Sequence, residues 1–260
     1  MTFVDAHTHL DHCHEEASFL VAEAEAAGVG LIIQSGTDLT RSRLSVKLAE
    51  TFPQVFATVG FHPHEAGRLD DEALAELEQW TAHPRVVAVG ETGFDFYHDH
   101  WPHHVQGEVF RLHLELARRA GLPVVVHTRE AADHTLATLA EYGAGLTVIL
   151  HCFSWPDRLQ EVVERGYYAS FAGNVTYKNA SALQEAARRL PAELLLLETD
   201  APWLSPMPLR GRPNRPSLVV KVYEFVAELR GLTIAELASQ VEANVRRAFP
   251  RTVEAGESAA

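Results

Sequence analysis

The 260-residue sequence predicts an α/β fold of the (β/α)8 TIM-barrel class, built as a single domain with extra C-terminal helices. Three observations support this prediction. Short apolar runs alternate with amphipathic stretches, the connections between them are short, and the length is close to the roughly 250 residues that such a barrel needs. Apolar residues make up 47% of the chain, which is sufficient for a full core and unlike a disordered protein.

Each apolar run is expected to form one strand of a parallel sheet, because strands covered on both faces read as continuous apolar segments. In chain order the runs span residues 3–7, 29–35, 55–60, 86–90, 123–127, 146–150, 166–171 and 194–199. Eight strands joined by helices are the number that closes a TIM barrel.

The segments between the runs predict the helices that cover the sheet. Stretches such as EEASFLVAEAEAAG, DEALAELEQWTA and GEVFRLHLELARRAG are amphipathic, and several of these segments end at glycine, as helix C-caps do. Two further helical stretches, 216–230 and 233–248, close the chain after a proline-rich segment. We therefore expect one barrel domain over residues 1–250 and a flexible tail over residues 251–260.

Composition argues against several classes of protein. The net charge of −13, with histidine neutral, disfavours binding to duplex nucleic acid through a broad basic surface, although bound cations can reverse the field at a small site. The two cysteines, Cys13 and Cys152, form no disulfide framework and indicate a reducing compartment. The first residues lack a signal-peptide pattern and no run is long enough to span a membrane. We expect a cytoplasmic protein with no membrane contact and no obligate protein partner.

Polar, metal-capable side chains follow the predicted strands at the C-terminal end of the barrel, where the active sites of TIM barrels lie. They are His7, His9, His62, Glu91, His127, His151 and Asp200. Folding does not require imidazoles at the same end of successive strands, and imidazole with carboxylate suits zinc, manganese or similar divalent ions. The pattern therefore predicts a two-metal site that activates a water. Glu91 can bridge the cations, Asp200 can take a proton from the water, and His62 is a third candidate catalytic residue.

Six motifs give the chain a specific resemblance to one family. In chain order they are DAHTHLD, GFHPH, GETGFDFY, PVVVHTRE, HCFS and ETDAPWL, and they cover residues 5 to about 216. With these motifs the chain resembles the TatD family of metal-dependent deoxyribonucleases, within the amidohydrolase-like superfamily of TIM barrels.

The resemblance implies both a cofactor and a reaction. Two divalent metal ions, either zinc, manganese or magnesium, would be held by His7, His9, Glu91, His127, His151 and Asp200. The reaction would be hydrolysis of phosphodiester bonds, as a 3′-to-5′ exonuclease on ends of single-stranded DNA, with RNA as a further candidate substrate. Trp155 stands where family members often carry glycine, and Arg215 where they often carry glutamate. These departures fall where substrate would enter and leave the metal ligands unchanged.

Positive and aromatic side chains near the predicted mouth are candidate substrate contacts. Arg129 follows the fifth strand, Lys178 follows the seventh, and Arg215 lies in the late loop; each can neutralise a phosphate. His62 can contact a phosphate or a metal-bound water. The candidates for stacking against unpaired bases are Phe94, Tyr97, Phe153, Trp155 and Trp203.

Other reactive residues have simpler interpretations. The histidines of YHDHWPHH, residues 97–104, lack the convergence of the strand ends and are expected to be solvated loop residues. His64 is expected to be structural. Cys152 follows His151 and should face the opposite side of the strand, so a buried, inert thiol in the barrel wall is expected.

Three other functions stay open beside the nuclease. Some TatD-like proteins are deacylases of D-aminoacyl-tRNA, in which the same activated water would attack an ester carbon, so an aminoacyl-tRNA is an alternative substrate. A cyclic-amide hydrolase is less favoured, because such enzymes often bridge their metals with a carboxylated lysine and this chain has Glu91 at the fourth strand. A binding protein without catalysis is disfavoured as well, because a full set of candidate ligands is present.

Overall fold

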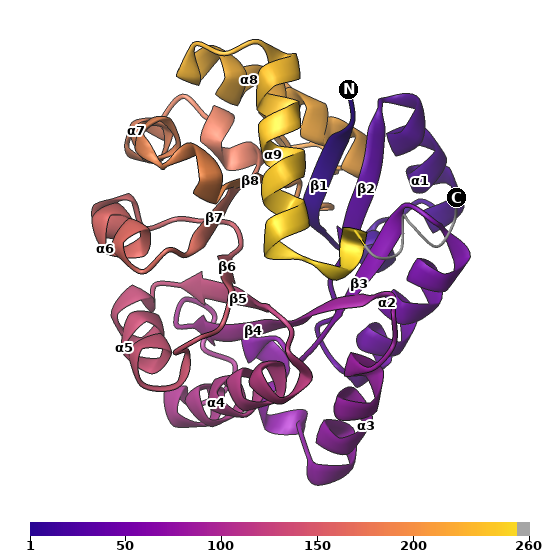
Figure 1. The fold of residues 1–260 in the computed structure, drawn as a ribbon, viewed down its shortest axis with the longest axis vertical. Coiled ribbons are helices and arrows are strands. Elements are labelled where there is room, and N and C mark those ends of the chain that lie inside the picture. The colour runs from indigo at the N-terminus through magenta and orange to yellow at the C-terminus, as the bar shows by residue number, and fades with distance from the viewer. Residues whose placement is uncertain (254–260) are drawn as a thin grey trace.

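The computed structural model describes residues 1–253 and confirms the predicted (β/α)8 barrel. Its parallel strands form one sheet in the order β1 to β8, with the helices outside it (Figure 1). The strands are β1 (Phe3–Thr8), β2 (Val29–Gln34), β3 (Val55–Val59), β4 (Val86–Asp95), β5 (Val124–Arg129), β6 (Val148–Leu150), β7 (Tyr168–Phe171) and β8 (Leu195–Leu197).

Helices follow each strand, and two close the chain, as the amphipathic segments predict. They are α1 (Ala17–Ala26), α2 (Leu39–Thr51), α3 (Asp71–Thr81), α4 (His103–Ala120), α5 (Ala132–Tyr142), α6 (Leu159–Glu164), α7 (Ser181–Arg189), α8 (Val219–Arg230) and α9 (Ile234–Ala248). Local residues account for several of the helix ends. The Asp38 and Asp70 carboxylates accept backbone N–H groups at the starts of α2 and α3, and Thr233 with Glu236 forms a capping box on α9.

Strand β4 is longer than the sequence predicts, because it continues to Asp95 instead of ending at Gly90. The residues beyond Gly90 stay in the strand because Thr92 to Asp95 pair with Val126 to Arg129 of β5. Gly93 lets β4 approach β5 closely: its φ is +137°, and a Cβ there would lie 2.1 Å from the carbonyl oxygen of His127. Glu91 is consequently a strand residue, held more rigidly than a loop residue would be.

The barrel closes between β1 and the end of β8. The backbone N–H of Asp200 donates to the carbonyl oxygen of His7 at 3.0 Å. Deeper in the same seam, the buried Asp5 carboxylate accepts the backbone N–H of Thr199 at 2.8 Å and its hydroxyl at 2.6 Å. Side chains and backbone together therefore fix the two strand ends that carry candidate ligands.

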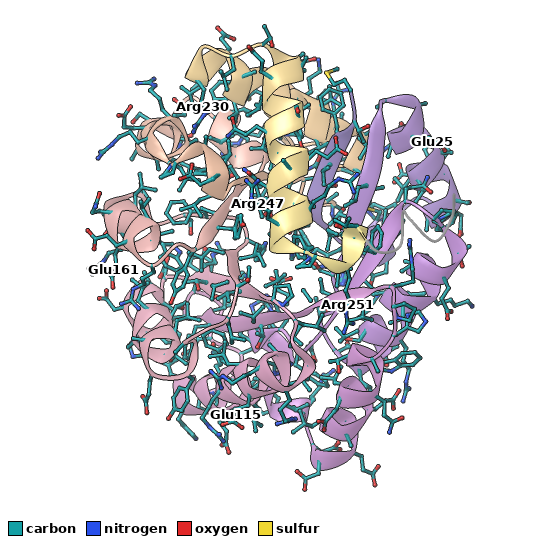
Figure 2. All side chains as sticks on the ribbon, viewed as in Figure 1. Glu25, Glu115, Glu161, Arg230, Arg247 and Arg251 are labelled. Atoms are coloured by element: carbon teal, nitrogen blue, oxygen red, sulfur yellow. The ribbon has the colours of Figure 1, made fainter. Side chains whose placement is uncertain are left out.

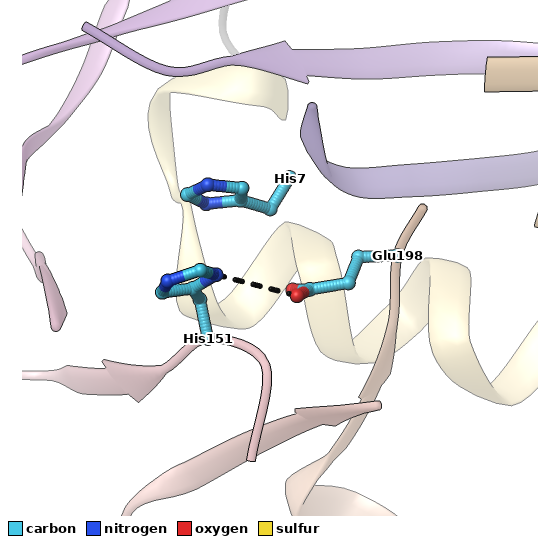
Figure 3. A group of neighbouring side chains, drawn as sticks. All are labelled: His7, His151 and Glu198. Atoms are coloured by element: carbon cyan, nitrogen blue, oxygen red, sulfur yellow. Dashed lines mark hydrogen bonds and ion pairs between the residues drawn. The ribbon is translucent and has the colours of Figure 1, made fainter. Parts of the chain in front are cut away.

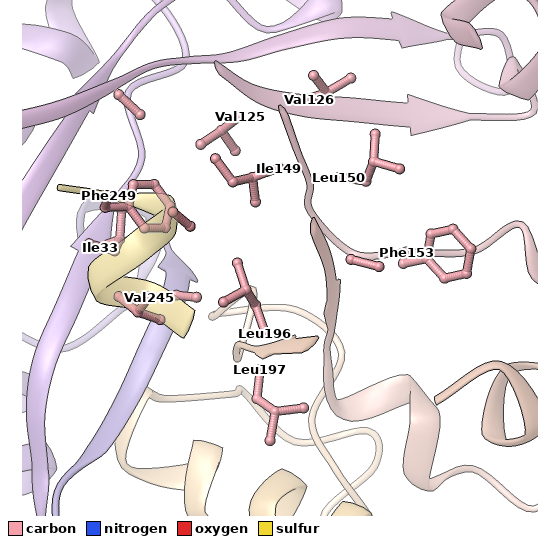
Figure 4. Packing of buried hydrophobic residues seen from close by; sticks show 14 of the residues in the cluster. Ile33, Val125, Val126, Ile149, Leu150, Phe153, Leu196, Leu197, Val245 and Phe249 are labelled. Carbon is pink, nitrogen blue, oxygen red and sulfur yellow. The ribbon is translucent and has the colours of Figure 1, made fainter. Parts of the chain in front are cut away.

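Helix α9 covers the opposite, N-terminal end of the barrel. Val245 of this helix and Phe249 just after it are fully buried and lie beside the strand residues Ile33 and Leu196 (Figure 4). Asn244 donates to the carbonyl oxygen at the start of β8 at 2.7 Å. The end of the barrel away from the strand C-termini is thus filled by the last helix.

Residues 251–253 belong to this closure, although the sequence predicts that a tail begins at residue 251. They form a helical turn, and the Arg251 guanidinium donates to the carbonyl oxygens of Thr81 and Val86 at 2.7 and 2.9 Å. The remaining residues of the expected tail, 254–260, lie outside the described residues.

Charged side chains cover the outside of the barrel. Glu25, Glu115 and Glu161 project from α1, α4 and α6 (Figure 2). Within residues 1–253, none of the helices combines the length and apolar character that crossing a membrane would require.

Candidate metal centre

A pocket of about 710 Å³ opens at the C-terminal ends of the strands. Its walls include most of the residues that the sequence predicts for the site, namely His9, His62, Glu91, His127, His151 and Asp200. His7, at the end of β1, is fully buried and lies beneath the pocket floor, where its ring stacks on that of His151 at 3.9 Å between centroids. The structure therefore brings all seven predicted strand-end residues together.

The Glu91 carboxylate lies between two pairs of imidazoles. Its Oε2 is 3.2 Å from Nε2 of His7 and 3.4 Å from Nε2 of His9. Its Oε1 is 2.9 Å from Nδ1 of His127 and 2.8 Å from Nε2 of His151. Each oxygen of this one carboxylate thus faces a separate pair of ring nitrogens.

Asp200 adds a second carboxylate on the side of His9. Its Oδ1 is 3.6 Å from Nε2 of His9, and its side chain is 13% exposed where that of Glu91 is 3% exposed. Asp200 has a φ of +53°, a backbone conformation that is uncommon outside glycine and that clusters at functional sites. The sharp turn, which follows Glu198 and Thr199 at the end of β8, places the carboxylate at the pocket surface.

The spacing of these groups fits divalent cations. The paired ring nitrogens are 3.1 Å apart in His7 and His9, and 3.2 Å apart in His127 and His151. Ligands bound at about 2.0 Å in a tetrahedral site are roughly 3.3 Å from one another. The buried Oε2 of Glu91 also has no hydrogen-bond donor within residues 1–253. A cation held by His7 and His9 would satisfy this oxygen.

Three of the four imidazoles are oriented by a polar group on their far side. Nδ1 of His7 lies 3.0 Å from the Ser35 hydroxyl, and Nδ1 of His151 lies 3.3 Å from Oε1 of Glu198 (Figure 3). Outer partners of this kind fix the ring orientation of metal-ligating histidines.

The third imidazole, His127, has its Nε2 3.4 Å from Oδ2 of Asp95. Neither Glu198 nor Asp95 is among the site residues predicted from the sequence. A prediction that extended the fourth strand to Asp95 would have placed Asp95 in the site. Asp95 lies four residues after Glu91, and the two side chains therefore share one strand face.

Burial and mutual charge set the protonation of the centre. Burial raises the pKa of Glu91, but the surrounding imidazoles, that of His151 foremost, hold this pKa well below its usual range. Burial lowers the pKa of His9, whereas the neighbouring carboxylates of Asp200 and Glu91 raise it, to about 10. Glu91 is therefore ionised and His9 protonated in the metal-free chain, so that a cation binding here would release a proton.

His62 occupies a third position beside Glu91. Its Nε2 is 3.5 Å from Oε1 of Glu91, its Nδ1 accepts the backbone N–H of His64, and its ring packs edge-on against His127. With a side chain that is 12% exposed, His62 can reach a ligand in the pocket.

The predicted substrate contacts divide into two groups. Arg129 lines the pocket, where its guanidinium lies 3.9 Å above the ring of Tyr97. Lys178 is exposed after β7 and is not part of the pocket wall. Arg215 also lies outside the pocket wall, because its guanidinium pairs with Glu15 and Glu23 and so holds the late loop against the segment around α1. The structure thus brings Arg129 to the pocket and places Lys178 and Arg215 away from it.

Exposure separates the five candidate stacking residues. Phe94, Phe153 and Trp155 are buried and serve packing. Trp203 is 48% exposed, lines the pocket, and has its ring 5.1 Å from that of His9. Tyr97 is exposed but lies under the Arg129 guanidinium. Trp203 is the aromatic residue best placed to meet a base.

Cys152 lies in the pocket wall, and the prediction that it faces the barrel wall is wrong. Strand β6 ends at Leu150, so the alternation of strand faces does not extend to Cys152, whose φ is +45°. Burial, followed by the negative charges of Asp200 and Glu198, raises the pKa of the thiol well above its usual range. The thiol stays protonated and is a poor nucleophile, in keeping with the expected inert character.

His98 also differs from the sequence-based expectation. It belongs to the segment 97–104, but it lines the pocket together with His64, and both rings contact Asp95. The other histidines of this segment, at positions 100, 103 and 104, are exposed.

A TIM barrel that gathers imidazoles and carboxylates around one pocket at its C-terminal mouth defines a metal-dependent hydrolase. The chain belongs to the TatD family: the sequence model of the family described as TatD related DNase matches residues 4–250.

Individual relatives agree with this assignment. The chain is 42% identical over 259 residues to an uncharacterized metal-dependent hydrolase TatD of Mycobacterium tuberculosis, covering 95% of this chain and 97% of that protein. It is 34% identical over 247 residues to a protein of Citrobacter rodentium named 3′-5′ ssDNA/RNA exonuclease TatD, covering 92% and 93% of the two chains. Among solved structures, the TatD homologue YJJV from Escherichia coli K12 matches with a TM-score of 0.88 at 31% identity, over 95% of this chain and 98% of that one.

Proposed function

We propose that this protein is a two-metal phosphodiesterase that shortens single-stranded DNA from its 3′ end, with RNA as a second substrate. The observation that carries the proposal is the position of Glu91, whose two carboxylate oxygens each face a separate pair of imidazole nitrogens. The polarity and the choice of single strands are taken from the name of the Citrobacter rodentium relative.

The ligands of the two cations follow from these contacts. One cation would be held by His7, His9, Glu91 and Asp200, and the other by Glu91, His127 and His151. This donor set suits zinc or manganese better than magnesium, which prefers more oxygen ligands. When bound, two such cations would lower the pKa of a water and stabilise the charge on the phosphate.

Asp200 is the group best placed to take the proton of the attacking water. Both of its neighbours in the centre, Glu91 and His9, are more deeply buried, whereas Asp200 reaches the pocket surface. During hydrolysis the water oxygen bonds to phosphorus, one phosphorus–oxygen ester bond breaks, and the departing oxygen takes up a proton.

Three further side chains would bind and orient the strand. The Arg129 guanidinium at the pocket wall would neutralise a phosphate, and His62 would contact a phosphate oxygen beside Glu91. The exposed face of Trp203 would stack on an unpaired base. Because a pocket with these groups needs a separated base, it favours single strands over a duplex.

The test uses metal-stripped protein reconstituted separately with zinc, manganese and magnesium. A single-stranded DNA labelled at its 5′ end should give a ladder of shortened labelled products, whereas a 3′ label should be released at once. The matching RNA shows whether a ribose is accepted. Metal-independent cleavage, or cleavage only at internal positions, would contradict the proposal.

A D-aminoacylated tRNA belongs in the same experiment as the alternative substrate. Neither relative described above carries a name that refers to aminoacyl-tRNA. Release of the amino acid with the DNA and RNA intact would retain the metal centre and move the reaction from phosphorus to carbon.

A further inference from the structure

The Asp95 carboxylate lies beside the candidate metal centre and collects three imidazoles. Its side chain is 1% exposed, and its Oδ2 is 2.8 Å from Nε2 of His64 and 3.2 Å from Nδ1 of His98. The third ring is that of His127, whose Nε2 is 3.4 Å from the same oxygen. The other ring nitrogen of His127 faces Glu91. Asp95 therefore stands on the outer side of a residue whose inner side faces the metal centre.

Hydrogen bonds alone leave this arrangement incomplete. The other carboxylate oxygen, Oδ1, is already taken by the backbone N–H groups of Tyr97 and His98, at 3.0 and 2.9 Å. Oδ2 has two lone-pair positions for three converging ring nitrogens. Correspondingly, the buried Nε2 of His127 has no hydrogen-bond partner within residues 1–253.

A cation among these groups would satisfy all of them. Lone pairs of His64 and His98 and one lone pair of Oδ2 would point at the cation, and the second lone pair of Oδ2 would accept the N–H of His127. The separations of 2.8 and 3.2 Å from Oδ2 are edges that a coordination shell with bonds of about 2.0–2.1 Å would have.

The segment that carries these ligands is firmly held. The Gln106 side chain accepts the backbone N–H of Asp95 at 2.9 Å and donates to the carbonyl oxygen of Trp101 at 2.7 Å. The Trp101 indole in turn donates to the carbonyl oxygen of His64 at 3.0 Å. The three donors are thus brought together by a network that does not depend on a cation.

We propose that His64, Asp95 and His98 bind a third divalent cation. Two imidazoles with one carboxylate suit zinc, manganese and cobalt. The side chains of His64 and His98 are 26% and 41% exposed and line the pocket, so the remaining coordination positions face the space where a substrate would lie. Because His64 and His98 are more exposed than the ligands around Glu91, this site binds its cation more weakly than that centre.

The role of this cation rests on the proposed function. A cation with open positions in the pocket would bind a phosphate oxygen of the strand and thereby add to the neutralisation by Arg129. The binding of the ion itself does not depend on which substrate the protein cleaves.

Metal content tests the site without reference to activity. Metal-stripped protein is dialysed against zinc at a series of free concentrations, and bound metal per chain is measured by elemental analysis. We expect wild type to approach three ions and His98→Ala to stop at two. His103→Ala is the matched control, because this exposed histidine of the same segment stacks on Phe96 at 3.5 Å and does not contact Asp95. It should bind three ions.

Saturation of wild type at two ions would overturn the proposal, and so would three ions in His98→Ala. His64→Gln is a second ligand variant and should also stop at two ions per chain. Circular dichroism of each variant shows whether a lost ion reflects a lost ligand or a misfolded protein. Cobalt provides a second readout, because the visible absorption of the third ion should be missing in both ligand variants. If the protein binds three ions but has no nuclease activity, the proposed reaction is wrong and the third site stands. If it is an active nuclease with two bound ions, the third site is wrong and the proposed reaction stands.

Discussion

The backbone N–H of Asp200 donates to the carbonyl oxygen of His7, and this bond joins the end of β8 to the end of β1. Both residues also contribute side chains to the candidate metal centre, on the same side of Glu91. The closure of the barrel therefore sets the spacing of these two ligands.

Replacing Glu91 by glutamine keeps the size of the side chain and removes the charge that both imidazole pairs face. We expect bound metal to fall by at least one ion per chain. Because the outer partners of metal ligands already contribute about 10- to 100-fold, kcat/KM should fall by more than about 100-fold. Elemental analysis and kinetics on single-stranded DNA measure the two effects. Full metal content with near-normal turnover would show that Glu91 does not bridge the cations.

Glu198→Gln tests whether the Glu198 carboxylate orients the His151 ring for metal binding. The buried Glu198 carboxylate contacts Nδ1 of His151 and also accepts the backbone N–H of Cys152 at 2.8 Å. Loss of its charge should weaken metal binding by about 10- to 100-fold, as competition with a chromogenic chelator would measure. The exposed Glu193→Gln is the matched control and should bind metal like wild type. Equal affinities in the two variants would count against a role for Glu198.

Arg129→Ala and Arg215→Ala should have different effects. Arg129 lines the pocket, so its loss should raise KM for single-stranded DNA and make binding less sensitive to salt. Arg215 pairs with half-exposed Glu23, so its loss should lower the free energy of unfolding by about 0.5–1 kcal/mol and leave KM unchanged. Urea unfolding and steady-state kinetics on both variants give the comparison. A higher KM in Arg215→Ala alone would reverse the assignment.

Trp203→Ala tests base stacking at the pocket rim. Stacking of a base on an aromatic ring contributes about 1–3 kcal/mol, which corresponds to a roughly 5- to 150-fold weaker Kd for single-stranded DNA. Fluorescence anisotropy in a Glu91→Gln background would measure binding with cleavage suppressed. Phe19→Ala, which removes another exposed aromatic ring that lies outside the pocket wall, should leave the Kd unchanged. If both variants bind equally, Trp203 does not stack on the substrate.

His113 makes stability depend on pH at a position away from the pocket. It is fully buried; its Nε2 accepts the N–H of Phe61 at 2.9 Å and its Nδ1 donates to the carbonyl oxygen of Val109 at 2.8 Å. Burial lowers its pKa from 6.5 to about 4. Between these values the unfolded chain binds a proton that the folded chain does not, so the free energy of unfolding rises with pH. A contribution of about 3 kcal/mol is complete above pH 6.5 and is lost as the pH falls toward 4.

His113→Gln keeps an acceptor and a donor at this position but does not titrate. The loss of stability between pH 7 and pH 4.5 should therefore be smaller in the variant than in wild type, by about 2–3 kcal/mol. Urea unfolding at the two pH values measures the difference. Identical losses in both proteins would mean that His113 does not take up a proton in this range.

The barrel and the gathering of strand-end residues could be predicted because both follow from local patterns. Apolar runs mark the strands, and the polar residues that end them, such as His7 and His127, reach one mouth because all strands are parallel. The predicted helices over 216–230 and 233–248 correspond to α8, preceded by one 3-10 turn, and to α9.

The partners of the site residues could not be predicted in the same way. Asp95 lies beyond the strand predicted over residues 86–90, whereas β4 continues to Asp95. Arg215 looked free to meet substrate because its partners, Glu15 and Glu23, are about 200 residues away in sequence. Such pairings depend on how the loops run in three dimensions, and the spacing of apolar residues along the sequence does not predict this.

The closure of the barrel by α9 and Arg251 has a practical consequence. The last described residues lie at the end of the barrel that is remote from the pocket, since Arg251 donates to the carbonyl oxygen of Val86, the first residue of β4. A molecule attached to a solid support through its C-terminal end would therefore present the pocket to the surrounding solution. The same orientation leaves the mouth clear for long polymeric ligands.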